Sequence, residues 1–195
     1  NYIKRQEVAT YRKQIRGGVG IVGMTTKEED IVDYLVCSYT HDDIYFFTNL
    51  GRVFKSKVYE LPATSRQSKG TPVVNIIQLG PNEKVTSILT VPQVKDGMKY
   101  FVMGTKNGQI KRTEIEKYDN IRKTGIVAIG LKPDDELKWV KKAQDGDDII
   151  LSTAKAQALR FGQEAARPMG RATRGVRGVR LRPGDQVVGV DAVSY

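Results

Sequence analysis

The chain has 195 residues, of which 39% are hydrophobic, with 32 Lys and Arg against 22 Asp and Glu. This suffices for one buried core or a row of small ones, and no apolar run reaches the roughly 18 residues of a membrane helix. We expect no signal peptide, because Asn1 to Gln6 is polar and basic. One cysteine excludes an internal disulfide and a cysteine-rich zinc site. The net charge of +10 points to nucleic acid, with an ordinary solubilising surface as the alternative.

A repeat begins in the opening residues. Its turn positions, at spacings of 50, 57 and 48 residues, are Asn1, Gly51, Gly108 and Ala156. Each turn after the first follows a strand that ends in Thr, and each leads into a strand with a basic residue four positions later. A period near 50 residues, built from four short strands, is typical of a propeller-like blade.

Every unit continues in the same order after this hairpin. A polar stretch leads to a basic residue and a glycine, and then come an apolar strand, an acidic turn and a last apolar strand. The last strands are expected at residues 31–36, 85–91, 137–143 and 187–193. The sequence therefore predicts an all-β fold, with one short turn of helix in residues 162–167. We expect a single repeat domain, residues 1–195, with approximate units 1–47, 48–104, 105–152 and 153–195.

No catalytic set is evident. The only histidine, His41, lies in a polar turn, and Cys37 follows an apolar strand and is expected to be a small core residue. The glycines at 17–20 lack the Lys-Ser or Lys-Thr of a P-loop. Acidic clusters at residues 28–30, 134–136 and 145–148 are expected to be solvated turns, because consecutive carboxylates rarely converge on one metal ion. We expect no catalytic residue and no metal site.

Basic residues recur at equivalent positions in two parts of the repeat. Those between the second and third strands are Arg12, Lys13, Arg16, Arg66, Lys69, Arg122, Lys123, Arg171 and Arg174. Those after the first turn are Lys4, Arg5, Lys55, Lys57, Lys111, Arg112 and Arg160. Equivalent positions should lie on one rim, where they would follow a phosphate backbone without reading bases.

The stretch "QIRGGVG", residues 14–20, concentrates glycine beside a cation. Glycine tolerates positive φ and lets backbone N–H groups approach a phosphate closely. Arg16 would add a forked set of donors for phosphate oxygens. The alternative is a glycine-rich turn between two strands, with Arg16 solvated.

Many motifs along the chain resemble one family. They are "YIKR", "TKEED", "FFTNLGRVFK", "SRQSKGTPVVN", "DDEL", "ARPMGRATRGVRGVRLRPGD" and "VVGVD". Together they cover nearly the whole chain and resemble the C-terminal β-pinwheel domain of DNA gyrase A, or its paralogue in topoisomerase IV. The family's box, Gln-Arg-Arg-Gly-Gly-Lys-Gly, is matched by Gln14, Arg16, Gly17, Gly18 and Gly20. Ile15 replaces its first arginine and Val19 replaces its lysine.

The resemblance implies a β-pinwheel of four-stranded blades that exchange strands. This chain would supply about four repeats, a fragment of a six-bladed domain. The implied function is non-sequence-specific DNA binding, bending and wrapping within a type IIA topoisomerase, in support of ATP-dependent negative supercoiling.

The implied partners are double-stranded DNA, the remaining gyrase A domains and gyrase B in an A2B2 assembly, without a membrane. No cofactor is expected in this chain, because the parent complex uses ATP and Mg2+ in other domains. The expected location is cytoplasmic and nucleoid-associated. Two alternatives stay open: the topoisomerase IV domain, which would serve substrate selection and decatenation, and a protein-interaction propeller whose basic rim meets an acidic partner. A hydrolase built on a propeller would need a His/Asp/Ser or metal constellation, which the sequence lacks.

Overall fold

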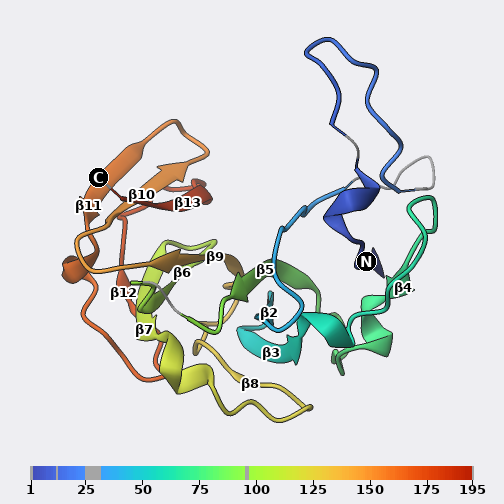
Figure 1. The fold of residues 1–195 in the computed structure, drawn as a ribbon. Coiled ribbons are helices and arrows are strands. Elements are labelled where there is room, and N and C mark those ends of the chain that lie inside the picture. The colour runs from blue at the N-terminus through green and yellow to red at the C-terminus, as the bar shows by residue number, and fades with distance from the viewer. Residues whose placement is uncertain (1, 12, 25–31, 95–96, 195) are drawn as a thin grey trace.

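The computed structural model describes residues 2–11, 13–24, 32–94 and 97–194. Small antiparallel sheets follow one another along an arc, as Figure 1 shows, and the helices are short 3-10 turns. The described strands are β1 (Tyr2–Ile3), β2 (Asp43–Thr48), β3 (Arg52–Lys57), β4 (Thr71–Pro72), β5 (Val85–Val91), β6 (Tyr100–Thr105), β7 (Gln109–Glu114), β8 (Ile126–Val127), β9 (Leu137–Ala143), β10 (Asp148–Thr153), β11 (Ala158–Gly162), β12 (Val176–Arg177) and β13 (Val187–Val193). The 3-10 helices are η1 (Val8–Thr10), η2 (Val58–Glu60), η3 (Val73–Asn75), η4 (Ile115–Tyr118) and η5 (Gln163–Ala165). The predicted all-β class is confirmed, and η5 is the helical turn expected within residues 162–167.

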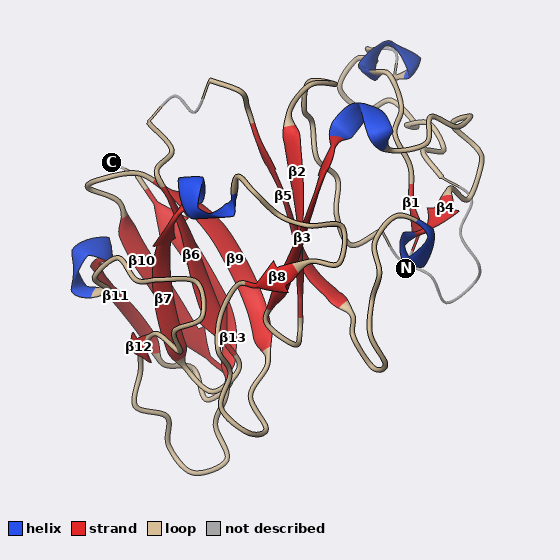
Figure 2. Cartoon of the chain, turned by 90° about the horizontal axis from the view of Figure 1, so that it is seen from below, coloured by secondary structure: helices blue, strands red, loops and turns tan. Residues whose placement is uncertain are grey.

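The sheets exchange their outer strands. The orders are β1-β4, β5-β2-β3-β8, β12-β7-β6-β9 and β11-β10-β13. Strands β4, β8 and β12 each pair with the second hairpin strand of the preceding unit, namely β1, β3 and β7. Strands β5, β9 and β13 lie toward the inside of the arc (Figure 1). Figure 2 shows β1 and β4 at one end of the molecule and the sheets around β6 and β10 at the other.

The hairpin turns explain part of the sequence repeat. Gly51, Gly108 and Ala156 have φ values of 74°, 81° and 57°, in the left-handed region that favours glycine. A Cβ atom at Gly51 would also lie 2.5 Å from the carbonyl oxygen of Ile129, so space requires glycine there too. The unit boundaries expected near residues 48, 105 and 153 coincide with the ends of β2, β6 and β10. Each hairpin therefore spans two sequence units while belonging to a single sheet.

A threonine and an acidic residue fasten each hairpin tip to a later turn. The Thr48, Thr105 and Thr153 hydroxyls donate to Glu83, Asp135 and Asp185 at 2.7, 2.7 and 2.8 Å. Asp147 and Asp135 are buried, so the expectation that the acidic clusters are solvated turns is wrong for both residues. Asp135 is the partner of Thr105. Its carboxylate also accepts the backbone N–H of Asn107, so a buried polar group is satisfied.

The core is a row of three apolar clusters, one between each pair of successive sheets. Strand β2 contributes to two of them, because its side chains alternate between the faces of the sheet. Ile44 and Phe46 join the cluster toward the first sheet, and Tyr45 and Phe47 join the one toward the third. The third cluster, which includes Ile110, lies between the sheets around β6 and β10. Of the two possibilities that the composition left open, one core or a row of small ones, the structure has the row.

Two expectations for the first unit are wrong. Residues 32–36 form no strand and are exposed, and Ile31 lies outside the described residues. The equivalent strands β5, β9 and β13 each pair with the first strand of a hairpin, whereas residues 32–36 pair with no described strand. Cys37, which follows this segment, is exposed and is not a core residue. Among the described residues, no helix is long and apolar enough to cross a membrane.

Candidate nucleic-acid interface

The loops that lead into the exchanged strands carry exposed cations. In Figure 1 the loops of residues 119–125 (yellow) and 166–175 (orange) lie on the outside of the arc. The loop cations that are exposed and make no ion pair with any described residue are Lys13, Arg16, Arg122, Lys123, Arg171 and Arg174. Arg12 lies outside the described residues. These loops therefore present positive charge at equivalent places in three units.

The segment of residues 13–24, which contains the box motif and is called the box loop below, extends away from the sheets (Figure 1). The Oε1 atom of Gln14 accepts the backbone N–H of Gly20 at 3.0 Å, which closes the loop into a ring of exposed residues. Gly17 and Gly20 have φ values of 87° and 80°, and a Cβ atom at either would meet nothing within 4 Å. Glycine is favoured at these two positions by the backbone conformation, not by crowding.

The two departures from the box pattern project into solvent. Ile15 is 88% exposed, and Val19 is fully exposed. Arg16, between them, is exposed as well. The loop therefore keeps one exposed cation and two exposed apolar side chains where the family pattern has three cations.

The glycines that follow the basic residues in later units have a structural role. Gly70, Gly125 and Gly175 have φ values of 86°, 72° and 78°. A Cβ atom would lie 2.6 Å from the Ile3 carbonyl oxygen at Gly70 and 2.4 Å from that of Ile110 at Gly175. These contacts occur where each exchanged strand begins and meets the preceding unit. The fold alone thus accounts for glycine here, and the basic neighbour remains on the outside.

Arg66 and Lys69 lie in the second loop, next to the first unit. The Nη1 atom of Arg66 donates to the carbonyl of Val22 at 2.8 Å, and the Nζ atom of Lys69 lies 4.0 Å from the ring centroid of Tyr2. Arg66 therefore joins the second loop to the end of the box loop.

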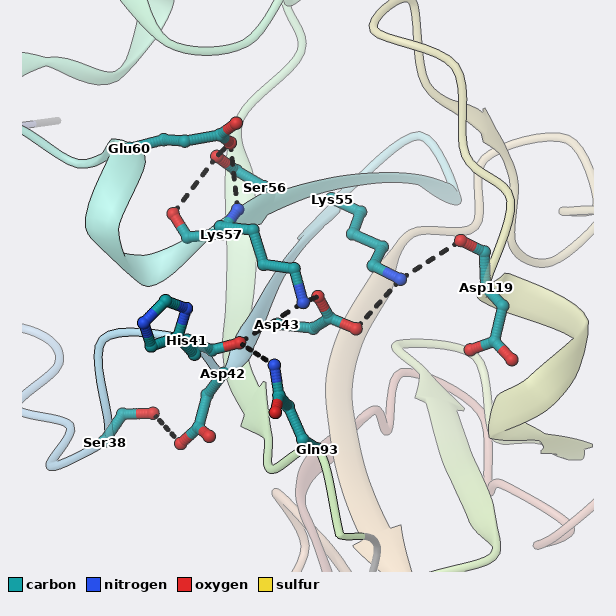
Figure 3. A network of polar contacts seen from close by, with 10 residues as sticks. All are labelled: Ser38, His41, Asp42, Asp43, Lys55, Ser56, Lys57, Glu60, Gln93 and Asp119. Carbon is teal, nitrogen blue, oxygen red and sulfur yellow. Dashed lines mark hydrogen bonds and ion pairs between the residues drawn. The ribbon is translucent and has the colours of Figure 1, made fainter.

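Basic residues of the hairpin strands are paired within the chain. Lys55 and Lys57 contact Asp43 at 2.9 and 2.6 Å, as Figure 3 shows. Burial opposes ionisation of Asp43, but hydrogen bonds from Lys57 and Lys55 outweigh it and lower the pKa of this carboxyl group. At the equivalent position, Arg160 contacts Asp148 at 2.6 Å. Each basic side chain is held by the strand beside it.

Two predicted rim residues do not lie on the surface. Lys111 is 0% exposed and Arg112 is 6% exposed, so the expectation of a rim position is wrong for both. The guanidinium carbon of Arg112 lies 4.5 Å from the ring centroid of Tyr100. The Nζ atom of Lys111 donates to the carbonyls of Ala128, at 2.6 Å, and Arg171. Burial, followed by the charges of Arg171 and Lys117, lowers the pKa of Lys111 to about 7.

The remaining two residues of this set, Lys4 and Arg5, bind backbone carbonyls. The Nζ atom of Lys4 donates to Arg66 and Ser68 at 2.5 and 3.0 Å, and the Nε atom of Arg5 donates to Leu61 at 3.2 Å. Their part in DNA binding stays a prediction, as it does for Lys55, Lys57 and Arg160.

Several exposed arginines near the end of the chain are not among the predicted rim residues. They lie neither in the few residues before Gly175 nor four residues after a hairpin turn, which are the two places where the repeat predicts a cation. Their high density in the last unit could have indicated them. These residues are Arg167, Arg177, Arg180 and Arg182.

The structure offers little for small-molecule chemistry. Among the described residues, no group of three or more His, Cys, Asp or Glu side chains could hold a metal ion. An open hollow of about 400 Å³ lies between β8 and residues 170–173, with Arg171 in its lining. His41 is exposed in its turn, as expected, with its ring against Tyr59.

Blade sheets that exchange their outer strands, with basic loops around them, define a β-pinwheel, a propeller-like class. The chain belongs to the DNA gyrase C-terminal domain family, described as a beta-propeller, whose sequence profile matches residues 1–37, 42–92, 99–144 and 147–194. It is 47% identical to the DNA gyrase A protein of Staphylococcus epidermidis (strain ATCC 12228 / FDA PCI 1200) over 194 residues, which is 100% of this chain and 22% of that protein. Identity to the DNA gyrase A protein of Staphylococcus aureus (strain NCTC 8325 / PS 47) is 46% over 191 residues, 98% of this chain and 22% of that protein.

Two solved structures have the same fold. A DNA gyrase A C-terminal domain superposes with a TM-score of 0.74 at 26% identity, covering 97% of this chain and 61% of that one. A C-terminal domain of DNA topoisomerase IV gives 0.72 at 28% identity, covering 80% and 48%. The chain spans about a fifth of the length of these curated relatives.

Proposed function

We propose that this chain binds, bends and wraps double-stranded DNA without sequence specificity, as the C-terminal module of gyrase A. One observation carries the proposal: exposed loop cations, without ion pairs to the described residues, recur at equivalent places around an arc of sheets. Cations arranged in this way neutralise successive phosphates, and a duplex that follows a curved surface must bend. Family membership supports the same assignment.

In the proposed setting, the parent enzyme is a type II topoisomerase that uses ATP and Mg2+ in other domains. The chain itself contributes no catalytic group, and it works with the rest of gyrase A and with gyrase B in an A2B2 assembly. Its location would be the cytoplasm, on the nucleoid. Wrapping would present a DNA segment to the catalytic domains with one handedness, which ATP use would convert into negative supercoils.

A second candidate is the corresponding domain of topoisomerase IV, which would select substrates for decatenation. The exposed Ile15 and Val19 favour it, because they remove two cations from the box. In that case the loops would hold DNA without constraining its path. The resemblance to a solved topoisomerase IV domain supports it equally at the level of the fold.

The test is duplex binding at increasing salt, with dyes on the DNA ends to report bending. Six loop cations on phosphates predict a slope of log K against log salt of about −5, and a shorter distance between the ends in the complex. A slope near zero, or no binding at low salt, would contradict the DNA-binding proposal. Steep salt dependence with unbent DNA would instead favour the second candidate. Binding to an acidic protein surface in preference to DNA would support an interaction propeller.

A further inference from the structure

Two lysines at equivalent positions of the repeat make the same contact. Lys4 follows the turn at Asn1 by three residues, and Lys111 follows Gly108 by three. The Nζ atom of Lys4 donates to the carbonyl of Arg66 at 2.5 Å, and that of Lys111 donates to the carbonyl of Arg171. These arginines are equivalent too, because each precedes the loop glycine by four residues. An amino group thus holds the same point of the basic loop in two different units.

The unit between them replaces both members of the pair. Phe54 stands at the lysine position and Ile121 at the arginine position. A Cβ atom at Gly125 would lie 2.7 Å from the ring of Phe54, so the ring fills the space beside this loop. Ile121 packs against the apolar core. Where the hairpin position holds lysine, the loop position holds arginine. Where the hairpin position holds the aromatic Phe54, the loop position holds the aliphatic Ile121.

Stability alone does not account for the lysine. Phe54 shows that an apolar residue can join a hairpin to the next loop in this fold, and it avoids the cost of burying an amino group. The Lys111 amino group also faces the like charge of Arg171. A residue that serves only packing would not be expected where the loop carries an arginine. The lysine does add a donor that fixes the backbone of this arginine.

We propose that Lys4 and Lys111 are positioning residues of the DNA interface. Lys111 holds the backbone of Arg171 so that its guanidinium group meets a phosphate, and Lys4 holds the backbone of Arg66, whose guanidinium group binds the end of the loop that carries Arg16. The inference rests on the proposed DNA-binding function. Arg171 and its neighbour Arg174 are exposed, and Lys111 fixes the loop at the first of them. Through Arg66, which donates to the Val22 carbonyl, Lys4 also fixes the end of the box loop.

The first experiment measures binding of the whole chain to a random-sequence duplex across a range of salt concentrations. The variants are Lys111→Met, Arg171→Gln and the double variant, and the matched control is Lys117→Met, an exposed lysine paired with Glu114. We expect Lys111→Met to reduce the steepness of the salt slope by about 1, as Arg171→Gln does. The double variant should be no worse than Arg171→Gln alone, and the control should match wild type. Additive losses in the double variant, or a wild-type slope for Lys111→Met, would overturn the inference.

Thermal unfolding distinguishes a positioning role of Lys111 from a purely structural one. Methionine preserves the packing, so the unfolding midpoint of Lys111→Met should equal or exceed that of wild type while the salt slope falls. If this variant does not fold, the partly exposed Lys4 provides the same test: Lys4→Met should act like Arg66→Gln, and wild-type slopes would overturn the proposal. A wild-type chain that shows no salt-dependent DNA binding would overturn the proposed function itself. Normal wild-type binding with unaffected lysine variants would overturn only the positioning role.

Discussion

Basic side chains in the hairpin strands have partners inside the chain, whereas those in the loops before the exchanged strands, apart from Arg66 and Lys69, face solvent. Lys55 and Arg160 contact carboxylates on the adjacent strand, and Lys111 is buried. Arg122 and Arg174 are exposed and free of ion pairs with the described residues. A cation that is already neutralised releases few counterions from DNA, so we expect affinity to depend on the loops.

The largest effect is expected from the loop arginines. Replacing Arg16, Arg171 and Arg174 together by Gln should reduce the steepness of the salt slope by about 3, because each phosphate contact contributes about 0.9. A strand variant, Arg160→Gln, should leave the slope nearly unchanged. Binding titrations at several salt concentrations measure both, and equal losses from loop and strand variants would remove the distinction between them.

The loop glycines should fall into two groups, because some are crowded by the fold and others meet no neighbour. Gly175→Ala brings a Cβ atom within 2.4 Å of the Ile110 carbonyl oxygen and also strains φ. We expect a loss of about 3 kcal/mol in the free energy of unfolding. Gly17→Ala meets no neighbour and should cost about 1 kcal/mol. Urea unfolding of the two variants checks this order, and equal costs would contradict the crowding at Gly175.

Lys111 should give stability a distinctive dependence on pH. Burial lowers its pKa to about 7 in the folded state, below its ordinary value of 10.5. Between these values the unfolded chain binds more protons, so stability rises with pH, by at most about 1.4 kcal/mol per pH unit. Below pH 7 Lys111 is protonated in both the folded and the unfolded state, so the full destabilisation from burying its charge is present. The free energy of unfolding of wild type minus that of Lys111→Met should therefore increase from about pH 7 to 10, and a flat difference would contradict a buried amino group.

The smallest effect is expected from the strand pairs. Asp43→Asn removes the carboxylate that Lys55 and Lys57 share, and should cost about 1 kcal/mol of stability at neutral pH. Because the pKa of Asp43 is lowered by folding, this contribution is present above its unfolded pKa and is lost as pH falls through its folded value. Urea unfolding at neutral and acidic pH measures the loss. The freed lysines should also steepen the salt slope of DNA binding, and an unchanged slope would mean that they cannot reach DNA.

The sequence predicted the all-β class and the hairpin turns well, because local rules govern both. Gly51 and Gly108 occupy turns that need positive φ, and the strands have β-branched and aromatic side chains. Composition left open whether one core or a row of small cores would form. Strand exchange came only from the family resemblance, since β8 and β12 are two residues long and their partners lie in another unit.

The interface was harder to predict, because exposure is decided by residues far away in the sequence. Arg112 and Arg160 occupy the same position of the repeat, yet Arg160 is exposed and Arg112 is buried, where Pro168 and Met169 pair with its backbone. Asp135 resembles a solvated turn residue, yet it pairs with Thr105 thirty residues earlier. Cys37 was expected in a core, but residues 32–36 before it pair with no described strand, and Cys37 is exposed. In each case the presence or absence of a partner distant in the sequence, not the residue type, sets the environment.

The central claim, that DNA wraps on the exposed loops, is tested most directly by sealing nicked circular DNA in the presence of the chain. After removal of protein, the linking-number distribution is read on a gel for wild type, the triple loop variant and Arg160→Gln. If DNA wraps on the loops, the linking-number distribution should shift positively with dose for wild type and Arg160→Gln, and should not shift for the triple loop variant. No shift with wild type at a dose that saturates the DNA would contradict wrapping, and a full shift with the loop variant would place the DNA elsewhere on the molecule.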